Sequence, residues 1–209
     1  MANIKRKSGG EKQPYHHGDL RAALMQAALQ LIDQHGIKGF SLKDAAADAG
    51  VSTAAPYRHF ADKDALLRAI QNEGFALFNT ALAAAYESAS GEQARIVELG
   101  VAYVRFAFEH PAHFRVMFSG SGGDQPEPVA NGGSASGFLL LVEAVAALHP
   151  HATEEIRNDL VLVCWSLVHG FAMLQMEGAF GGSLGIGDPE GRLRRALTVL
   201  TERTAEQRQ

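Results

Sequence analysis

The stretch SLKDAAADAGVSTAAPYRHF, residues 41–60, decides the fold. In its first half, apolar side chains recur three and four positions apart, which is the spacing of one helix face. Ser41 precedes this face, and Asp44 lies three residues after Ser41. This spacing is typical of a capped helix N-terminus. Gly50 favours the left-handed backbone that ends a helix. The pattern predicts a helix closed by Gly50, a tight turn and a second short helix.

The second short helix would start near Ser52, which can cap it, and end at Phe60. Two helices joined by a short turn containing glycine form the helix-turn-helix plan, whose second helix enters the major groove of DNA. Pro56 lacks an amide hydrogen and is tolerated only in the first turn of a helix. We therefore expect the start of this helix to be distorted or the helix to be shortened.

The rest of the chain predicts further helices and neither β-strands nor repeats. By apolar spacing, the additional helices cover residues 19–35, 62–88, 92–109, 112–118, 138–148, 153–177 and 189–203. Glycine-rich connections at 119–137 and 178–191 separate the later helices, and the first of these predicts a long flexible loop. The fold class is therefore all-α, with about nine helices.

The composition is that of an ordinary soluble protein, with 46% apolar and 20% charged residues. The longest nearly apolar run, 160–174, is shorter than the roughly 18 residues of a membrane-spanning helix. The N-terminus shows no secretory pattern. The single cysteine, Cys164, excludes an internal disulfide and fits a reducing compartment. We therefore expect a cytoplasmic protein with no membrane partner.

The charge is distributed unevenly along the chain. The net charge of −4 alone argues against a nucleic-acid partner. Residues 1–70, however, hold ten Lys/Arg and seven Asp/Glu, whereas the remainder holds nine and sixteen. This distribution predicts that only the N-terminal part of the chain contacts the phosphates of a nucleic acid. Residues 1–17 predict a flexible basic arm that reaches DNA, or alternatively a solvated tail.

About 50 residues around the helix-turn-helix closely resemble the DNA-binding domain of TetR-family transcriptional regulators. The core of the resemblance is GVSTAAPYRHFADKDALL, residues 50–67, preceded by FSLKDAAADA. Ala45 departs from the family, which usually has a larger aliphatic side chain there. Trp165, His169 and Gly170 also resemble the Trp-His-Gly core of one C-terminal domain class of the family. The matching N-terminal residues are Gly39, Phe40, Ser41, Ala46, Ala49, Gly50, Val51, Ser52, Tyr57, His59, Phe60, Lys63 and Leu66.

The resemblance implies a homodimeric, ligand-responsive repressor that binds a palindromic double-stranded DNA operator. It implies a DNA-binding domain over 18–65 and a helical domain for effector binding and dimerisation over 66–209. The last two long helices would form the dimer interface. An unknown small-molecule effector, and no cofactor, would move the helix that starts at Asp62 and release DNA.

Candidate DNA contacts lie in and beside the helix-turn-helix. Lys43 and Lys63 would neutralise phosphates, while small apolar side chains could touch thymine methyl groups. Arg58 could instead pair locally with Asp62 or Asp64, and we assign Phe60 to the core. The full set of candidates is Lys43, Ser52, Thr53, Ala54, Ala55, Tyr57, Arg58, His59 and Lys63.

Candidate pocket residues lie in the apolar C-terminal helices, where aromatic and Met side chains could surround a small ligand or simply form the core. His169 lies in the most apolar run and needs a hydrogen-bond partner, as a pocket group or as a core histidine. The nine histidines show no metal-ligand spacing with Cys or Asp, so no metal site is expected. The candidate pocket residues are Phe106, Phe114, Met117, Trp165, His169 and Met173.

Two other classes of protein compete with a transcription factor. An enzyme is disfavoured because the sequence has no nucleophile elbow, no phosphate-binding loop and no paired carboxylates beside a base. A helical protein–protein adaptor could retain a helix-turn-helix without binding DNA. Salt-dependent DNA binding discriminates these classes, because several phosphate contacts give a steep fall of affinity with salt. The sequence names neither the effector nor the operator.

Overall fold

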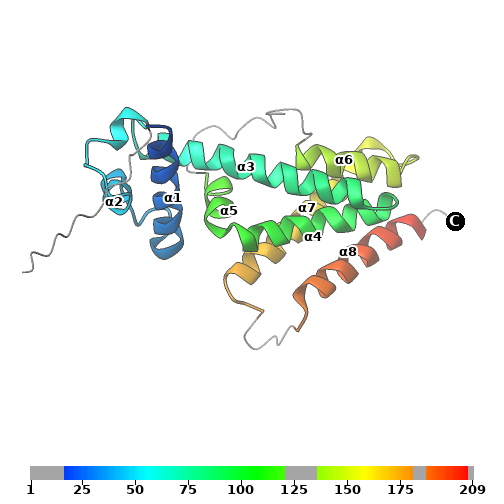
Figure 1. Ribbon diagram of the computed structural model, residues 1–209. Coiled ribbons are helices and arrows are strands. Elements are labelled where there is room, and N and C mark those ends of the chain that lie inside the picture. The colour runs from blue at the N-terminus through cyan, green and yellow to red at the C-terminus, as the bar shows by residue number, and fades with distance from the viewer. Residues whose placement is uncertain (1–16, 121–135, 181–186, 207–209) are drawn as a thin grey trace, which may run out of the picture. The chain divides into compact units, whose positions relative to one another are not determined.

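A computed structural model describes residues 17–120, 136–180 and 187–206. The chain divides into two compact units, residues 1–63 and 64–209. Within the described ranges there are eight α-helices, one 3₁₀ helix and no β-strand (Figure 1). The predicted all-α fold class is thus confirmed. The basic arm and most of the two glycine-rich connections lie outside the described residues.

The first unit contains α1 (His17–His35), α2 (Leu42–Asp48) and the 3₁₀ helix η1 (Pro56–Arg58). Gly36 has a φ of +74°, so it adopts the left-handed conformation that ends α1 where the sequence predicted. Helices α1 and α2 pack against each other. The buried apolar side chains of this unit include Leu24, Ala28, Ile32, Phe40, Leu42, Ala45, Ala46 and Phe60.

Both ends of α2 are closed by local hydrogen bonds. At the start, the Asp44 amide donates to the Ser41 hydroxyl oxygen at 3.3 Å, and the Ser41 amide donates to Asp44 Oδ2 at 2.8 Å. At the end, Gly50 has a φ of +69°, and its amide donates to the Ala47 carbonyl. The Val51 amide donates to the Ala46 carbonyl, which completes a Schellman motif. The sequence prediction for this helix is confirmed at both ends.

The second helix of the motif is shorter than a regular α-helix. Only Pro56–Arg58 are helical, as a 3₁₀ turn, so the prediction of a helix from Ser52 to Phe60 is wrong in its extent. The reason is Pro56, which has no amide hydrogen to donate to the Ser52 carbonyl. That carbonyl accepts instead from the Ala55 amide at 3.0 Å, the tighter pattern of a turn.

The second unit is a bundle of six helices whose observed bounds lie within two residues of the predicted ones at most ends. Helix α4 packs against α5, α6, α7 and α8 and is therefore its central helix. Phe78 on α3 meets Tyr103 and Phe106 of α4 edge-on, with ring centroids 5.1 and 5.2 Å apart. The helices are α3 (Lys63–Ser88), α4 (Glu92–Glu109), α5 (Pro111–Met117), α6 (Gly137–Leu148), α7 (Glu154–Met176) and α8 (Pro189–Glu206).

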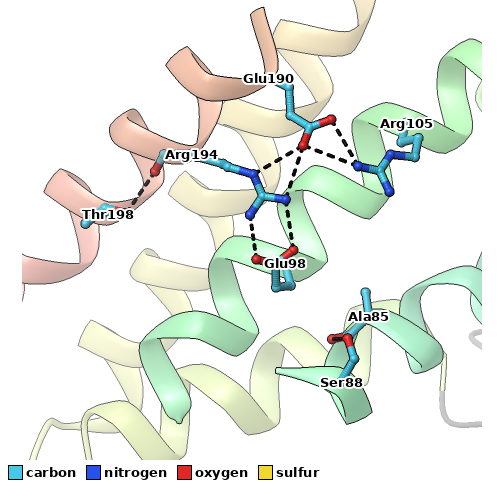
Figure 2. A network of polar contacts seen from close by, with 7 residues as sticks. All are labelled: Ala85, Ser88, Glu98, Arg105, Glu190, Arg194 and Thr198. Atoms are coloured by element: carbon cyan, nitrogen blue, oxygen red, sulfur yellow. Dashed lines mark hydrogen bonds and ion pairs between the residues drawn. The ribbon is translucent and has the colours of Figure 1, made fainter. Parts of the chain in front are cut away.

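Helix α8 is tied to α4 by an ion-pair network (Figure 2). The Arg194 guanidinium donates to the Glu98 carboxylate of α4 and to Glu190 one turn earlier on α8. Arg105 of α4 also reaches Glu190, with Nη2 3.1 Å from Oε2. These side chains are partly exposed, so each pair contributes at most about 1 kcal/mol. The network therefore sets the alignment of α8, while buried Leu193 and Leu197 supply most of the contact energy.

Replacing Ser41 with alanine should lower the free energy of unfolding by about 1 kcal/mol, because the α2 N-cap loses its side-chain acceptor. Hydrogen bonds from the Ser41 side chain, and then from its backbone, hold the pKa of Asp44 below the ordinary 3.8. A depressed folded-state pKa stabilises the protein above pH 3.8, and this contribution is lost as the pH falls through the folded value. S41A should therefore also flatten the loss of stability below that pH. Urea denaturation followed by far-UV circular dichroism measures both effects.

Ser52→Ala is the matched control, because Ser52 is an exposed serine in the turn rather than at the start of α2. It should change the free energy of unfolding by less than about 0.5 kcal/mol. Equal losses for the two variants would contradict the capping role of Ser41.

Candidate functional site

The first candidate site is the exposed surface of the helix-turn-helix. Six of the nine predicted DNA contacts have exposed side chains. Tyr57 is 53% exposed although it is a large aromatic residue, so it is not a core side chain. Phe60 is 3% exposed and carries the Arg21 guanidinium 5.3 Å from its ring centroid, which confirms its assignment to the core. The exposed predicted contacts are Lys43, Ser52, Thr53, Ala54, Tyr57 and Arg58.

The other three predicted contacts, Ala55, His59 and Lys63, are half-buried. The Lys63 ammonium donates to the Phe40 carbonyl at 2.6 Å and lies 4.2 Å from the centroid of the Phe40 ring. This ammonium therefore joins the start of α3 to Phe40, two residues before α2, in a contact between positions 23 apart in the chain. Sequence spacing predicted only a phosphate contact for Lys63, because the contact with Phe40 depends on the folded turn.

The second candidate site is a cavity of about 640 Å³ inside the second unit. All six helices α3 to α8 contribute to its wall. The wall is mostly apolar, and aliphatic side chains alternate in it with aromatic ones such as Phe75, Phe78, Phe118, Phe138 and Trp165. Its volume lies within the range of sites that take drug-sized molecules.

Three of the six predicted pocket residues, Met117, Trp165 and His169, line the cavity. Phe106 and Phe114 are 3% and 1% exposed and pack in the core behind the wall. Met173 is 38% exposed on α7 and is not among the lining residues. Apolar spacing identified the right helices but did not separate the cavity side of each helix from its core side.

A short polar chain runs along the cavity wall. Tyr103 Oη lies 2.8 Å from His169 Nδ1. Burial raises the pKa of the Tyr103 hydroxyl, and a side-chain hydrogen bond with Trp165 acts in the opposite direction. Burial also lowers the pKa of His169, so its ring is neutral at pH 7. The predicted need of His169 for a partner is met by Tyr103, on the neighbouring helix α4.

Several polar lining residues were not predicted. Asn72 and Asn79 lie seven residues apart on α3, and the Asn79 side-chain oxygen accepts from the Gly137 amide at 2.9 Å. The seven-residue spacing on one helix face was a usable signal in the sequence. Ser166 and Cys164 belong to α7, and burial raises the pKa of the Cys164 thiol to about 11. Cys164 is therefore a weak nucleophile at neutral pH.

In the described parts of the chain, no three His, Cys, Asp or Glu side chains gather as a metal site requires. His113 instead lies 3.1 Å from Glu73, as a pair between α5 and α3.

Comparison with known proteins relates both units to one family. Residues 24–70 match the family model of bacterial regulatory proteins of the tetR family. Residues 96–200 match a model described as a tetracyclin repressor-like C-terminal domain. The HTH-type transcriptional regulator YobS of Bacillus subtilis is 26% identical over 157 residues, which cover 75% of this chain and 79% of YobS.

Solved structures show the same relationship over nearly the whole chain. A protein of unknown function from Rhodococcus sp. RHA1 is 31% identical, with a TM-score of 0.70 over 91% of this chain and 98% of that one. A regulatory protein of the tetR family from Rhodococcus RHA1 shares the fold at 19% identity, with a TM-score of 0.66 over 87% and 95% of the two chains. The chain therefore belongs to the TetR family of bacterial transcriptional regulators.

Proposed function

We propose that this regulator is a repressor that binds a near-palindromic operator as a homodimer and releases it when a small molecule enters the C-terminal cavity. The observation that carries the proposal is the cavity of about 640 Å³ within the unit that follows the helix-turn-helix. A protein of this family needs no catalytic group to act, because differential binding of an effector to two conformations is enough. We place it in the cytoplasm, where operator DNA lies.

The exposed turn and 3₁₀ helix form the proposed reading surface, within a DNA-binding domain over residues 18–65. Thr53, Ala54 and Tyr57 would face the major groove, and Lys43 would neutralise a phosphate. The shortness of η1 supports a footprint of few base contacts, since only three residues are helical there. The three half-buried candidates would mainly support this surface and contact the DNA backbone. These are Ala55, His59 and Lys63.

The proposed dimer interface is the exposed apolar face of α7 together with α8, in a domain over residues 66–209. Helix α7 is long and apolar enough to cross a membrane by length and composition alone. Within the single chain, only 22% of its most apolar 18-residue segment is buried, so most of this segment faces outward. Val161, Cys164, Val168 and Ala172 form its buried stripe. The other side exposes large apolar side chains that a second copy would cover. These are Ile156, Val163, Met173 and Leu174, with Val199 on α8.

The cavity is connected to the reading surface through α3. This helix starts at Lys63 without an intervening linker, and it contributes Asn72, Phe75 and Asn79 to the cavity wall. An occupant that contacts these side chains can favour one position of α3 over another, and only such differential contact changes DNA affinity. Trp165, His169 and Gly170 support assignment to the Trp-His-Gly class of C-terminal domains.

Replacing Lys43 and Tyr57 together with alanine should weaken operator binding and make it less sensitive to salt. Each lost phosphate contact lowers the slope of log affinity against log salt by about 1, so losing Lys43 from both protomers lowers it by about 2. Gel shift at several salt concentrations measures the change. The DNA is a fragment selected from a random-sequence library by the unaltered protein.

Arg115→Ala is the matched control, because it removes one positive charge from an exposed position of the second unit. Its affinity and salt slope should equal those of the unaltered protein. Unchanged binding by the Lys43/Tyr57 double variant would refute the proposed reading surface. Binding with no salt dependence in the unaltered protein would refute DNA binding through phosphates altogether.

Charged substitutions on the exposed face of α7 should produce monomers. Val163 and Leu174 are 47% and 49% exposed and do not line the cavity, so Val163→Asp with Leu174→Glu leaves the fold of each chain intact. Light scattering should report about twice 22.4 kDa for the unaltered protein and about 22.4 kDa for the variant. Operator affinity should fall in parallel, since a monomer contacts one half-site.

Leu77→Glu provides the control for a charge on an exposed apolar position, because Leu77 is 42% exposed on α3. This variant should remain dimeric. A double α7 variant that keeps the dimeric mass would show that the interface lies elsewhere.

A further inference from the structure

We propose that the C-terminal cavity selects an uncharged, ring-bearing molecule that accepts a hydrogen bond from Nε2 of His169. The proposal rests on the proposed function, in which this cavity is the effector site, and names the chemical class of the effector. It follows from three features of the cavity: the charge of its wall, the aromatic rings that form it, and the direction of its polar chain.

The described wall of the cavity has no ionised side chain. Among the described lining residues there is no Asp, Glu, Lys or Arg. An ion that moves from water into such a site loses its hydration shell and gains no partner of opposite charge, so its binding is strongly disfavoured. A carboxylate would meet no cation, and an amine would meet no carboxylate. The wall therefore favours molecules that carry no charge at neutral pH.

Aromatic side chains give the cavity flat walls. Phe138 and Trp165 meet edge-on with centroids 5.5 Å apart, and Phe75 meets Phe118 in the same manner at 6.1 Å. All four line the cavity. Ring faces and edges attract the rings of a ligand by offset stacking and edge-to-face contact, beyond the burial of apolar area. The occupant that fits these walls carries aromatic or other flat rings.

The polar chain on the wall determines which ring nitrogen of His169 carries the proton. Over the residues that the structure describes, the Tyr103 hydroxyl has no acceptor other than His169 Nδ1, 2.8 Å away. Because a buried hydroxyl donates its hydrogen where an acceptor is within reach, this hydrogen is directed to Nδ1. A neutral imidazole that accepts at Nδ1 carries its hydrogen on Nε2.

The hydrogen on Nε2 remains for a ligand. In the described part of the chain, the ring of His169 makes its hydrogen bond at Nδ1 and none at Nε2. The ring packs against Phe114 and Phe118, with centroids 5.8 and 4.9 Å away, so its orientation is held by apolar contacts. A ketone, ether or amide oxygen on the ligand would satisfy this donor. A hydrocarbon of the same shape would leave it unpaired, at a cost in affinity.

Three probes of nearly equal shape test the proposal. Benzophenone has two rings and a carbonyl acceptor, diphenylmethane lacks the acceptor, and 4-benzoylbenzoate keeps the acceptor but adds a negative charge. Equilibrium dialysis against the full-length protein without DNA measures all three in the same way. Benzophenone should bind about threefold to tenfold more tightly than diphenylmethane, the value of one hydrogen bond. It should bind at least tenfold more tightly than 4-benzoylbenzoate.

Two variants locate the donor. His169→Phe keeps a ring but removes the donor, so the preference for benzophenone over diphenylmethane should fall to about one. His110→Phe is the matched control, because His110 is a half-buried histidine of the same unit that packs on Phe106 and does not line the cavity. The control should keep the preference of the unaltered protein. An unchanged preference in His169→Phe, or its loss in His110→Phe, overturns the assignment of the donor.

A photolabelling experiment uses only the unaltered protein, so its outcome does not depend on whether the variants fold. Irradiated benzophenone inserts into neighbouring C–H bonds, and mass spectrometry of the unaltered protein should find it on peptides of the cavity wall, such as the one containing Met117. Labelling elsewhere, tighter binding of 4-benzoylbenzoate, or no binding of any probe overturns the proposal. Gel shift without probe is scored separately. If the protein binds its operator but does not bind benzophenone, this inference alone is refuted. If the protein binds benzophenone but no operator, the proposed function is refuted.

Discussion

The close approach of α7 and α8 to α4 at Gly100 is the contact on which the C-terminal unit depends. A Cβ atom at this position would lie 2.4 Å from Leu197 Cδ1 and 3.0 Å from Val168 Cγ1. A larger residue at position 100 would therefore require the Leu197 side chain, and to a smaller degree that of Val168, to move. Because Gly100, Val168 and Leu197 all line the cavity, the same contact sets the depth of the cavity and the position of the exposed α7 face. The proposed effector cavity and the proposed dimer face thus share one structural constraint.

Elements defined by local interactions were predicted well from the sequence. Ser41 and Asp44, which lie three residues apart, cap the start of α2. Such contacts depend on the local backbone alone, so sequence spacing is enough to identify them. The shortening of the second helix was also expected from the sequence, because Pro56 lacks an amide hydrogen. The extent of the shortening was not predictable, because it depends on the Ser52 carbonyl finding the Ala55 amide within the turn.

The cavity was predicted only in part, because six helices form it and its wall depends on their rotations. Phe106 and Trp165 both lie on apolar helices, yet one packs in the core and the other lines the cavity. A modest rotation of either helix would exchange these roles, and sequence periodicity does not resolve it. The pairing of Tyr103 with His169 joins residues 66 positions apart. Only the packing of α4 on α7 brings them together.

Trp165 and Cys164 are the sole tryptophan and the sole cysteine of the chain, and both line the cavity. An occupant of the cavity must therefore change the surroundings of the only indole fluorophore and the only thiol in the protein. Emission of Trp165 therefore reports occupancy without any label. The regulator thus carries, in the wall of its own cavity, a single fluorophore that responds to what the cavity holds.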